Sequence, residues 1–271
     1  MTRPILFLTD YGLEDEYVGV CHAVMARLAP EARVVDLTHG IPPRDVLTGA
    51  LALSGAVPYA PDDAVYLAVV DPGVGTDRRA VALQAGGALL VGPDNGILGL
   101  AARALGDVAK AVGVDPQRVA TGPVSPTFHG RDVFAPAAAL LATGSSLEDL
   151  GPTIDPTTLV GAEPEEPLVG PGRLGTSVLG VDRFGNLRLA ARPEHLGAVG
   201  LGHDLVLLSG ADPVPLRLVA TFGDLGEEEL GLLEDSGGWL AVVRNGESAA
   251  RSLGLGPHSP VILAAAADAI G

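Results

Sequence analysis

The first 150 residues alternate short apolar runs with segments whose apolar residues recur at helical spacing. The apolar runs occupy residues 5–8, 33–37, 64–70, 80–85 and 88–91, and the helical segments occupy residues 17–28, 46–57 and 133–143. Short apolar runs bounded by turn residues are typical of buried strands. Strands that alternate with helices favour a mainly parallel sheet covered by helices on both faces. We therefore predict an α/β domain over residues 1–155.

The second part of the chain has a different texture. Prolines and glycines interrupt residues 151–173, and acidic residues lie among them, which is typical of a linker. We place this proline-rich linker at residues 156–173. The apolar runs beyond it are short and bounded by turns, at residues 175–181, 187–190, 205–208, 216–222, 239–243 and 261–264. This spacing predicts a smaller all-β, barrel-like domain over residues 174–271.

The charge and the apolar runs exclude several classes of partner. Lys and Arg number 17 against 33 Asp and Glu, a net charge of −16 that suits no nucleic-acid backbone. No apolar run approaches the roughly 20 residues that span a bilayer. The run before Asp10 has four apolar residues, too few for a signal peptide. We expect a cytoplasmic protein that binds neither nucleic acid nor membrane. The single Cys21 excludes a disulfide framework.

Three predicted strands of the first domain end at a polar side chain. Asp10 follows the first strand, His39 the second and Asp71 the third. Ligands of open α/β sheets bind beyond the carboxyl ends of the strands, because the loops converge there. Aspartate is also a common turn former and helix cap, so Asp10 alone fits a structural role equally well.

The loop at residues 71–79 carries the strongest local signal. Gly73 and Gly75 free the backbone for a close approach, and Arg78 lies far enough from Asp71 to fold back onto it. A neighbouring arginine would hold this carboxylate ionised and oriented. The alternative is a plain Pro-Gly turn with a solvated arginine pair.

A histidine precedes the predicted helix at 133–143. Histidine titrates near neutrality, so His129 suits proton handling or orienting a nucleophile, although capping that helix would explain it too. Phe128 beside it suits either the core or stacking on a nucleobase. His22 falls in a helical run and His39 closes a strand, so both fit structural roles. The chain has no metal-binding motif, and we predict no bound metal, with a divalent ion on Asp10, Asp71, His39 and His129 as the alternative.

Eight short segments occur in the order of one known family. They are residues 9–19 (TDYGLEDEYVG), 35–39 (VDLTH), 41–43 (IPP), 70–79 (VDPGVGTDRR), 92–96 (GPDNG), 127–132 (TFHGRD), 182–186 (DRFGN) and 243–245 (VRN). With these the chain resembles the S-adenosylmethionine hydroxide adenosyltransferases, relatives of the fluorinase and chlorinase. The segments span nearly the whole sequence, which makes the resemblance specific.

The resemblance implies an architecture and an activity. It implies an N-terminal α/β domain, a C-terminal β-barrel-like domain and a homotrimer whose adenosyl sites lie between subunits. The implied reaction is hydrolysis of S-adenosyl-L-methionine to adenosine and L-methionine by attack of water at C5′. S-adenosylmethionine is the implied substrate, and no cofactor is expected.

The resemblance also implies roles for particular residues. Asp71, Arg78 and His129 match the catalytic set of the hydrolase-type members, whereas a halogenase would have Tyr at position 71 and no histidine at 129. Asp10 matches the residue that holds the ribose diol, and Asp15 the one that meets the methionine ammonium. The other expected substrate-binding residues are Phe128, Asp182, Phe184, Asn186, Phe222, Ser236 and Arg244.

Two positions depart from the fluorinase pattern. Arg44 stands where the fluorinase has a tryptophan beside the sugar, and Gly237 stands where it has an arginine near the methionine carboxylate. We therefore expect Ser236 or a backbone amide to hold that carboxylate.

Two other classes of function remain open at the level of sequence. The chain could be a metal-dependent phosphoesterase or nucleotidase with Asp10 and Asp71 as ligands. It could also bind adenosine or S-adenosylmethionine without turning it over.

Overall fold

The computed structural model describes residues 2–210 and 212–266, which form two compact units, Met1–Glu163 and Pro164–Gly271. The boundary falls inside residues 156–173, where the sequence predicts the linker. That stretch contains a short helix, η3 (Pro156–Thr158), in the first unit and a strand, β8 (Leu168–Gly170), in the second. Among the described residues, no helix combines the length and apolarity needed to cross a bilayer.

The first unit is built on a mixed seven-stranded sheet with the order β2-β1-β3-β5-β4-β6-β7. Its strands are β1 (Ile5–Thr9), β2 (Val34–Thr38), β3 (Val65–Val69), β4 (Ala80–Ala85), β5 (Ala88–Pro93), β6 (Val108–Gly113) and β7 (Thr153–Ile154). Strands β2, β1, β3 and β5 run parallel, and β4, β6 and β7 continue the sheet antiparallel. This confirms the predicted α/β fold and adds β6 and β7, which the sequence analysis did not predict.

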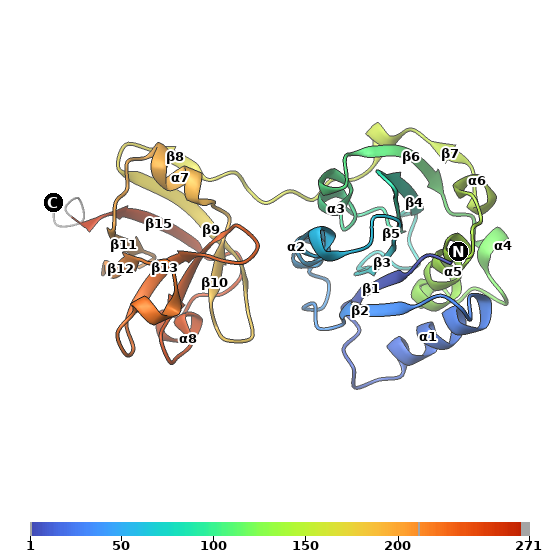
Figure 1. Cartoon of the computed structure of the whole chain (residues 1–271), viewed down its shortest axis with the longest axis horizontal. Coiled ribbons are helices and arrows are strands. Elements are labelled where there is room, and N and C mark those ends of the chain that lie inside the picture. The colour runs from blue at the N-terminus through green and yellow to red at the C-terminus, as the bar shows by residue number, and fades with distance from the viewer. Residues whose placement is uncertain (1, 211, 267–271) are drawn as a thin grey trace. The chain divides into compact units, whose positions relative to one another are not determined.

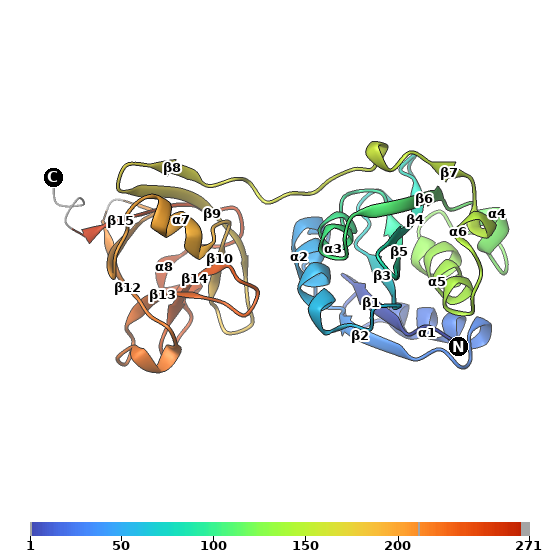
Figure 2. The same ribbon diagram turned by 45° about the horizontal axis from the view of Figure 1, so that its top comes forward.

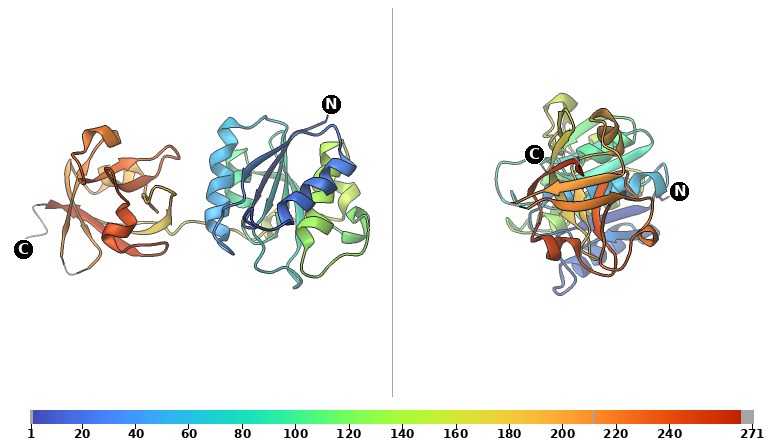
Figure 3. Two further views of the ribbon diagram at one scale, coloured as in Figure 1. Left: turned by 90° about the horizontal axis from the view of Figure 1, so that it is seen from below. Right: turned by 90° about the vertical axis from the view of Figure 1, so that its left-hand side faces the viewer.

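Helices cover both faces of this sheet, as Figure 3 shows in its left view. Helices α1 (Tyr17–Leu28) and α5 (Ala135–Ala142) pack against the face that carries Ile5 and Phe7 of β1. The opposite face carries Leu6 and Leu8 and packs against partly buried and buried residues of α2 (Val46–Ala56) and α3 (Gly99–Ala104). Successive side chains of a strand point to opposite faces, so a strand that is apolar throughout must be covered twice.

The remaining helices of the first unit are short. They are α2 (Val46–Ala56), η1 (Val57–Tyr59), α3 (Gly99–Ala104), α4 (Pro116–Val119), the π-helical turn η2 (Gly130–Phe134) and α6 (Leu147–Leu150). The sequence predicts a helix from residue 133, but α5 begins at Ala135 because the wider π turn precedes it. Such turns are rare and often mark functional sites.

The second unit is a closed β-barrel, which confirms the predicted barrel-like fold (Figures 1 and 2). Its strands are β9 (Arg173–Val181), β10 (Leu187–Leu189), β11 (Asp204–Leu208), β12 (Val214–Leu218), β13 (Leu230–Glu234), β14 (Leu240–Arg244) and β15 (Pro260–Ala265). Strand β10 pairs with both β14 and β9, which closes the ring, and β8 adds to β9. Closure removes exposed strand edges from the ring.

Leucine and valine side chains fill the barrel, among them Leu187, Leu207 and Val242, which are fully buried. Short helices accompany the strands: α7 (Pro193–Ala198), η4 (Phe222–Asp224) and α8 (Ala249–Leu253). The sequence predicts a strand over residues 216–222, whereas β12 ends at Leu218 and Phe222 opens η4. It also misses β13, whose Gly231 interrupts the apolar pattern.

Candidate active site

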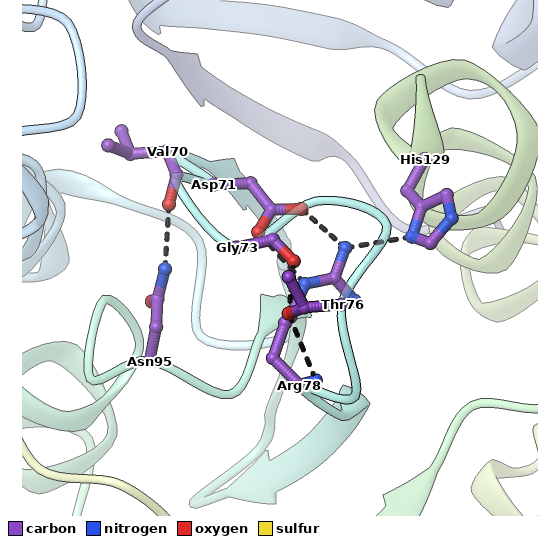
Figure 4. A network of polar contacts seen from close by, with 7 residues as sticks. All are labelled: Val70, Asp71, Gly73, Thr76, Arg78, Asn95 and His129. Carbon is purple, nitrogen blue, oxygen red and sulfur yellow. Dashed lines mark hydrogen bonds and ion pairs between the residues drawn. The ribbon is translucent and has the colours of Figure 1, made fainter. Parts of the chain in front are cut away.

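Asp71, Arg78 and His129 come together at the carboxyl end of β3 (Figure 4). The Nε atom of Arg78 donates to Oδ1 of Asp71 at 2.8 Å, and its Nη2 atom donates to Oδ2. The same Nη2 lies 2.8 Å from Nδ1 of His129. One guanidinium therefore joins a carboxylate and an imidazole that are far apart in sequence.

This ion pair is well shielded from solvent. The side chains of Asp71 and Arg78 are 7% and 11% exposed, and the guanidinium carbon of Arg78 lies 5.1 Å from the ring centroid of Phe134. Removing one partner of a buried pair leaves the other charge uncompensated, so the two side chains hold each other in place.

Gly75 brings the 71–79 loop close to the segment that precedes His129. Its φ of +78° lies in the left-handed region, and a Cβ there would stand 2.6 Å from the carbonyl oxygen of Pro126. A side chain would thus meet both backbone strain and a steric clash. The glycine explains how Arg78 can reach His129.

The protonation state of His129 follows from its surroundings. Burial lowers its pKa, the cation of Arg78 lowers it further, and Asp71 and Asp132 oppose the shift only in part. The imidazole is therefore neutral near pH 7. Because Arg78 can only donate, Nδ1 must carry the lone pair and Nε2 the proton. The three side chains thus present a carboxylate acceptor and an imidazole N–H donor.

Asp10 follows β1 and is held by backbone. Its Oδ2 accepts a hydrogen bond from the backbone N–H of Arg44 at 2.9 Å. Within the described residues Oδ1 of Asp10 accepts no hydrogen bond. Arg44, one of the two positions that depart from the fluorinase pattern, has a φ of +68°. This left-handed backbone is unusual for a residue with a side chain, and it aims the N–H at Asp10.

The aromatic rings of Tyr11, Tyr17 and Phe128 pack against one another, and Phe128 is next to His129 in the sequence. Phe128 lies edge-to-face against Tyr11 and Tyr17, with ring centroids 5.8 and 5.2 Å away. Phe128 is half-buried, so part of its ring stays accessible.

Asp15, predicted to bind substrate, lies exposed in the bend that precedes α1.

Tyr11 is a site residue that the sequence analysis missed. An ideal Cβ on Gly130 would lie 2.1 Å from the hydroxyl oxygen of Tyr11, so the phenol covers the backbone next to His129. Burial, reinforced by Cys21, Asp10 and Asp71, raises the pKa of Tyr11. The hydroxyl therefore stays protonated. Its position directly after Asp10 is the signal that could have found it.

The 92–96 segment forms a hydrogen bond to the backbone next to Asp71. Asn95 donates from Nδ2 to the carbonyl oxygen of Val70 at 2.8 Å, next to Asp71 (Figure 4). Asp94 is buried, pairs with Arg79 and accepts a hydrogen bond from the backbone N–H of Val160 at 2.9 Å. These contacts are structural and fix the ends of two neighbouring strands.

Three predicted residues of the second unit lie in one turn. In the turn between β9 and β10, Asp182 accepts at Oδ1 from the backbone N–H groups of Phe184 and Asn186, both at 2.9 Å. The side-chain amide of Asn186 donates to Oδ2 of Asp182 at 2.7 Å. Phe184 is 78% exposed at the tip of this turn. The aspartate therefore organises the turn that presents the aromatic ring.

Three more predicted residues lie elsewhere on the barrel. Phe222 and Ser236 are exposed, and Arg244 ends β14, where its guanidinium contacts Glu228 and Glu247. Gly237, the second departure, would place a Cβ 3.2 Å from Oδ1 of Asp235 and 3.6 Å from the Nη2 atom of Arg188. The loop that contains Ser236 thus leaves little room for a larger residue at 237.

The geometry gives little support to a metal on Asp10 and Asp71. Both oxygens of Asp71 are engaged by Arg78. Across residues 2–210 and 212–266, no group of three candidate ligands includes Asp10, Asp71 or His129. The carboxylate of Asp71 is arranged to accept a proton or a hydrogen bond rather than to bind a divalent ion.

Comparison with known proteins identifies the family. Residues 5–151 match the model of the SAM hydroxide adenosyltransferase N-terminal domain, and residues 176–262 match that of the C-terminal domain. The chain belongs to the SAM hydroxide adenosyltransferase family. The recognition made from the eight sequence segments is thereby confirmed.

The relatives of this chain differ in their similarity to it. It is 51% identical to a (R)-S-adenosyl-L-methionine hydrolase of Salinispora tropica, covering 93% of this chain and 94% of the relative. For the enzyme of the same name from Thermus thermophilus the identity is 44%, over 96% and 99%. A fluorinase of Nocardia brasiliensis is 30% identical over 92% of both chains. The chain is thus more similar to these hydrolases than to that fluorinase.

Solved structures share the fold. An uncharacterized conserved protein from Thermotoga maritima superposes with a TM-score of 0.88 at 31% identity, over 96% of this chain and 99% of the other. A conserved hypothetical protein from Thermus thermophilus gives a TM-score of 0.76 at 42% identity, with the same coverage.

Proposed function

We propose that this protein hydrolyses S-adenosyl-L-methionine to adenosine and L-methionine. The linked set of Asp71, Arg78 and His129 at the end of β3 carries the proposal, because it supplies a proton acceptor and a donor where α/β sheets bind ligands. The hydrolases that are 44–51% identical to the chain support it. The enzyme class and the family are shared with these relatives.

The chemistry needs few catalytic groups. The oxygen of a water molecule bonds to C5′ of the substrate while the C5′–S bond breaks and its electron pair goes to sulfur. The leaving group is a neutral thioether released from a sulfonium cation, so it needs no general acid. The protein must position the water and accept its proton.

Each residue of the set has one task in this proposal. The Nε2–H of His129 donates to the water oxygen and orients it, and the carboxylate of Asp71 accepts the proton. Arg78 holds the carboxylate and the imidazole in their relative positions. General-base assistance of this kind contributes about 10²–10⁴-fold. No metal or cofactor takes part in this scheme.

The proposed substrate contacts come from both units. The free Oδ1 of Asp10 would accept from a ribose hydroxyl, Asp15 would meet the ammonium, and Phe128 would contact the adenine. On the barrel, the proposed contacts are Asp182, Phe184, Asn186, Phe222, Arg244 and, for the carboxylate, Ser236 or a backbone amide. The exposure of Phe184 and Phe222 supports their availability to a ligand.

The assembly forms part of the same proposal. We expect a cytoplasmic homotrimer in which a neighbouring subunit supplies the barrel residues to each site. Light scattering in solution tests this, with an expected mass of three times the 27.4 kDa of one chain. A monomer at working concentration would contradict it.

The decisive experiment incubates the purified protein with S-adenosylmethionine and follows adenosine and methionine by chromatography, with and without a chelator. We expect equal amounts of the two products in both cases, and no halogenated nucleoside when fluoride or chloride is added. Asp71→Asn and His129→Ala should slow the reaction about 100-fold or more. Asp77→Asn, an exposed aspartate of the same loop, serves as the matched control.

Three outcomes would contradict the proposal. Wild-type rates in both Asp71→Asn and His129→Ala would remove the assigned roles. Loss of turnover in chelator would favour the metal-dependent phosphoesterase or nucleotidase. Tight binding of S-adenosylmethionine without product would favour a non-catalytic binding protein.

A further inference from the structure

A cluster of metal-ligand side chains lies on the first unit and takes no part in the proposed reaction. His22 projects from α1, Asp36 lies on β2, and His39 follows β2. The Nε2 atom of His22 is 2.9 Å from Oδ1 of Asp36, and the Nε2 atom of His39 is 3.2 Å from the same oxygen. Their ligand atoms all lie within 4.8 Å of one another.

His39 is the least expected member of this cluster. Its side chain is 3% exposed, and its Nε2 has no hydrogen-bond partner although it faces Asp36. Leaving a buried polar atom unpartnered is unfavourable, so each such atom in a folded protein needs an explanation. A bound ion would supply the missing partner.

The opposite nitrogen of His39 is already engaged. Its Nδ1 lies 2.9 Å from Oγ1 of the buried Thr9, which fixes the orientation of the ring. Metal-bound imidazoles are commonly anchored in this way through their second nitrogen. The ring of Phe7 packs edge-on against both His22 and His39, which shields one side of the cluster.

The spacing and the donor types suit one class of ion. Ligands at about 2.0–2.2 Å from one ion are separated by about 3–3.5 Å, close to the two distances measured here. Two imidazole nitrogens and one carboxylate oxygen suit Zn²⁺ and other divalent first-row transition ions. The side chains of His22 and Asp36 are 34% and 45% exposed, which leaves an entry path and room for water.

We propose that His22, Asp36 and His39 bind a divalent transition ion such as Zn²⁺, with at least one position open to water. The ion would stabilise the loop that carries Asp10. Thr9 Oγ1 accepts from the backbone N–H of Tyr11 at 3.2 Å, and the backbone N–H of Gly12 donates to the carbonyl oxygen of His39 at 2.8 Å. The ion takes no part in the proposed reaction, so its removal should lower Tm and leave adenosine formation in place.

The test uses the full chain without a histidine tag, stripped of metal by a chelator. Titration with Zn²⁺ in a calorimeter should show one ion per chain, and Co²⁺ should give a visible absorption band. Bound Zn²⁺ should raise Tm, because a ligand of the folded state stabilises it. His22→Ala and Asp36→Asn should each weaken the affinity at least about tenfold.

The matched control is His203→Ala, which removes an exposed histidine from the other unit and should bind Zn²⁺ as the wild type does. Both test positions are partly exposed, and the Tm of each metal-free variant reports whether it has folded. Unchanged affinity in both His22→Ala and Asp36→Asn would overturn the proposal. So would the absence of saturable one-to-one binding by the wild type, which would leave a plain hydrogen bond between His22 and Asp36.

Discussion

The Nη2 atom of Arg78 lies 2.8 Å from Nδ1 of His129, while the same guanidinium spans both oxygens of Asp71. A single planar cation therefore sets the orientation of the Asp71 carboxylate and fixes the tautomer of the imidazole. This arrangement favours a positioning role for Arg78, since its Nε and Nη2 donors are used by its two neighbours.

Arg78→Lys should lower kcat by about 10²-fold or more. A lysine ammonium keeps the charge, but it lacks the planar fork that contacts two carboxylate oxygens and an imidazole together. Steady-state kinetics of adenosine formation measure the effect. Arg118→Lys, at an exposed ion pair with Asp115, is the matched control and should retain full activity. A kcat of Arg78→Lys within twofold of the wild type would contradict the assigned role.

The pH dependence of activity should follow His129. Because burial and Arg78 lower its pKa, the neutral form that donates through Nε2 persists below the ordinary value of 6.5. The acid limb of kcat/KM should therefore have its midpoint below pH 6.5. The acid limb should be absent from the profile of His129→Asn if it reports this histidine. If it is absent there but has its midpoint above pH 6.5 in the wild type, the lowered pKa of His129 is contradicted.

Stability should depend on pH through the same residue. Above pH 6.5 His129 is neutral in both the folded and the unfolded chain, and it contributes nothing to the pH dependence. Below 6.5 the unfolded chain binds a proton that the folded chain does not, so the free energy of unfolding falls until the lowered pKa of the folded state is reached. Urea titrations at several pH values should show a smaller fall in His129→Asn.

Gly130→Ala should disturb the site through Tyr11. The added Cβ would lie 2.1 Å from the Tyr11 hydroxyl oxygen and 3.1 Å from its Cζ, so the buried ring must move. Overpacking of this kind costs about 1–3 kcal/mol of the free energy of unfolding. Removing the hydroxyl in Tyr11→Phe should recover part of this loss in the double variant, as measured by urea unfolding.

A matched glycine provides the control for that experiment. Gly99→Ala lies in α3, where a Cβ would meet nothing within 4 Å, and should leave stability unchanged or slightly improved. Strict additivity of Gly130→Ala and Tyr11→Phe would show that the two residues do not interact.

Asp10→Asn should raise KM more than it lowers kcat. The amide can still accept the backbone hydrogen bond from Arg44, so the loop is retained, but the charge offered to a ribose hydroxyl is lost. Hydrogen bonds to charged groups contribute about 1.5–3 kcal/mol, which corresponds to roughly 10–100-fold in KM. A substrate analogue without ribose hydroxyls should bind equally to variant and wild type. An unchanged KM for S-adenosylmethionine would contradict the role of Asp10.

Local sequence pattern was sufficient to predict several elements of the fold. The apolar run that forms β1, the helical spacing of α1 and the two apolar runs that form β4 and β5 could all be recognised from neighbouring residues. The same holds for Asp10 and Asp71 at the ends of strands. Strand β6 lies next to the edge strand β7 and has mixed exposure, as at Lys110, so it showed no clear apolar period and was not predicted.

Which of these residues come into contact depends on the tertiary structure. Arg78 and His129 are 51 residues apart, and their contact depends on the order of strands in the sheet and on the close approach at Gly75. The sequence shows His22 only as one residue of a helical run. Its contact with Asp36 exists because α1 and β2 lie close together in the fold. Hydrophobic periodicity reports the face that a residue occupies, whereas these pairings depend on long-range packing that no local pattern encodes.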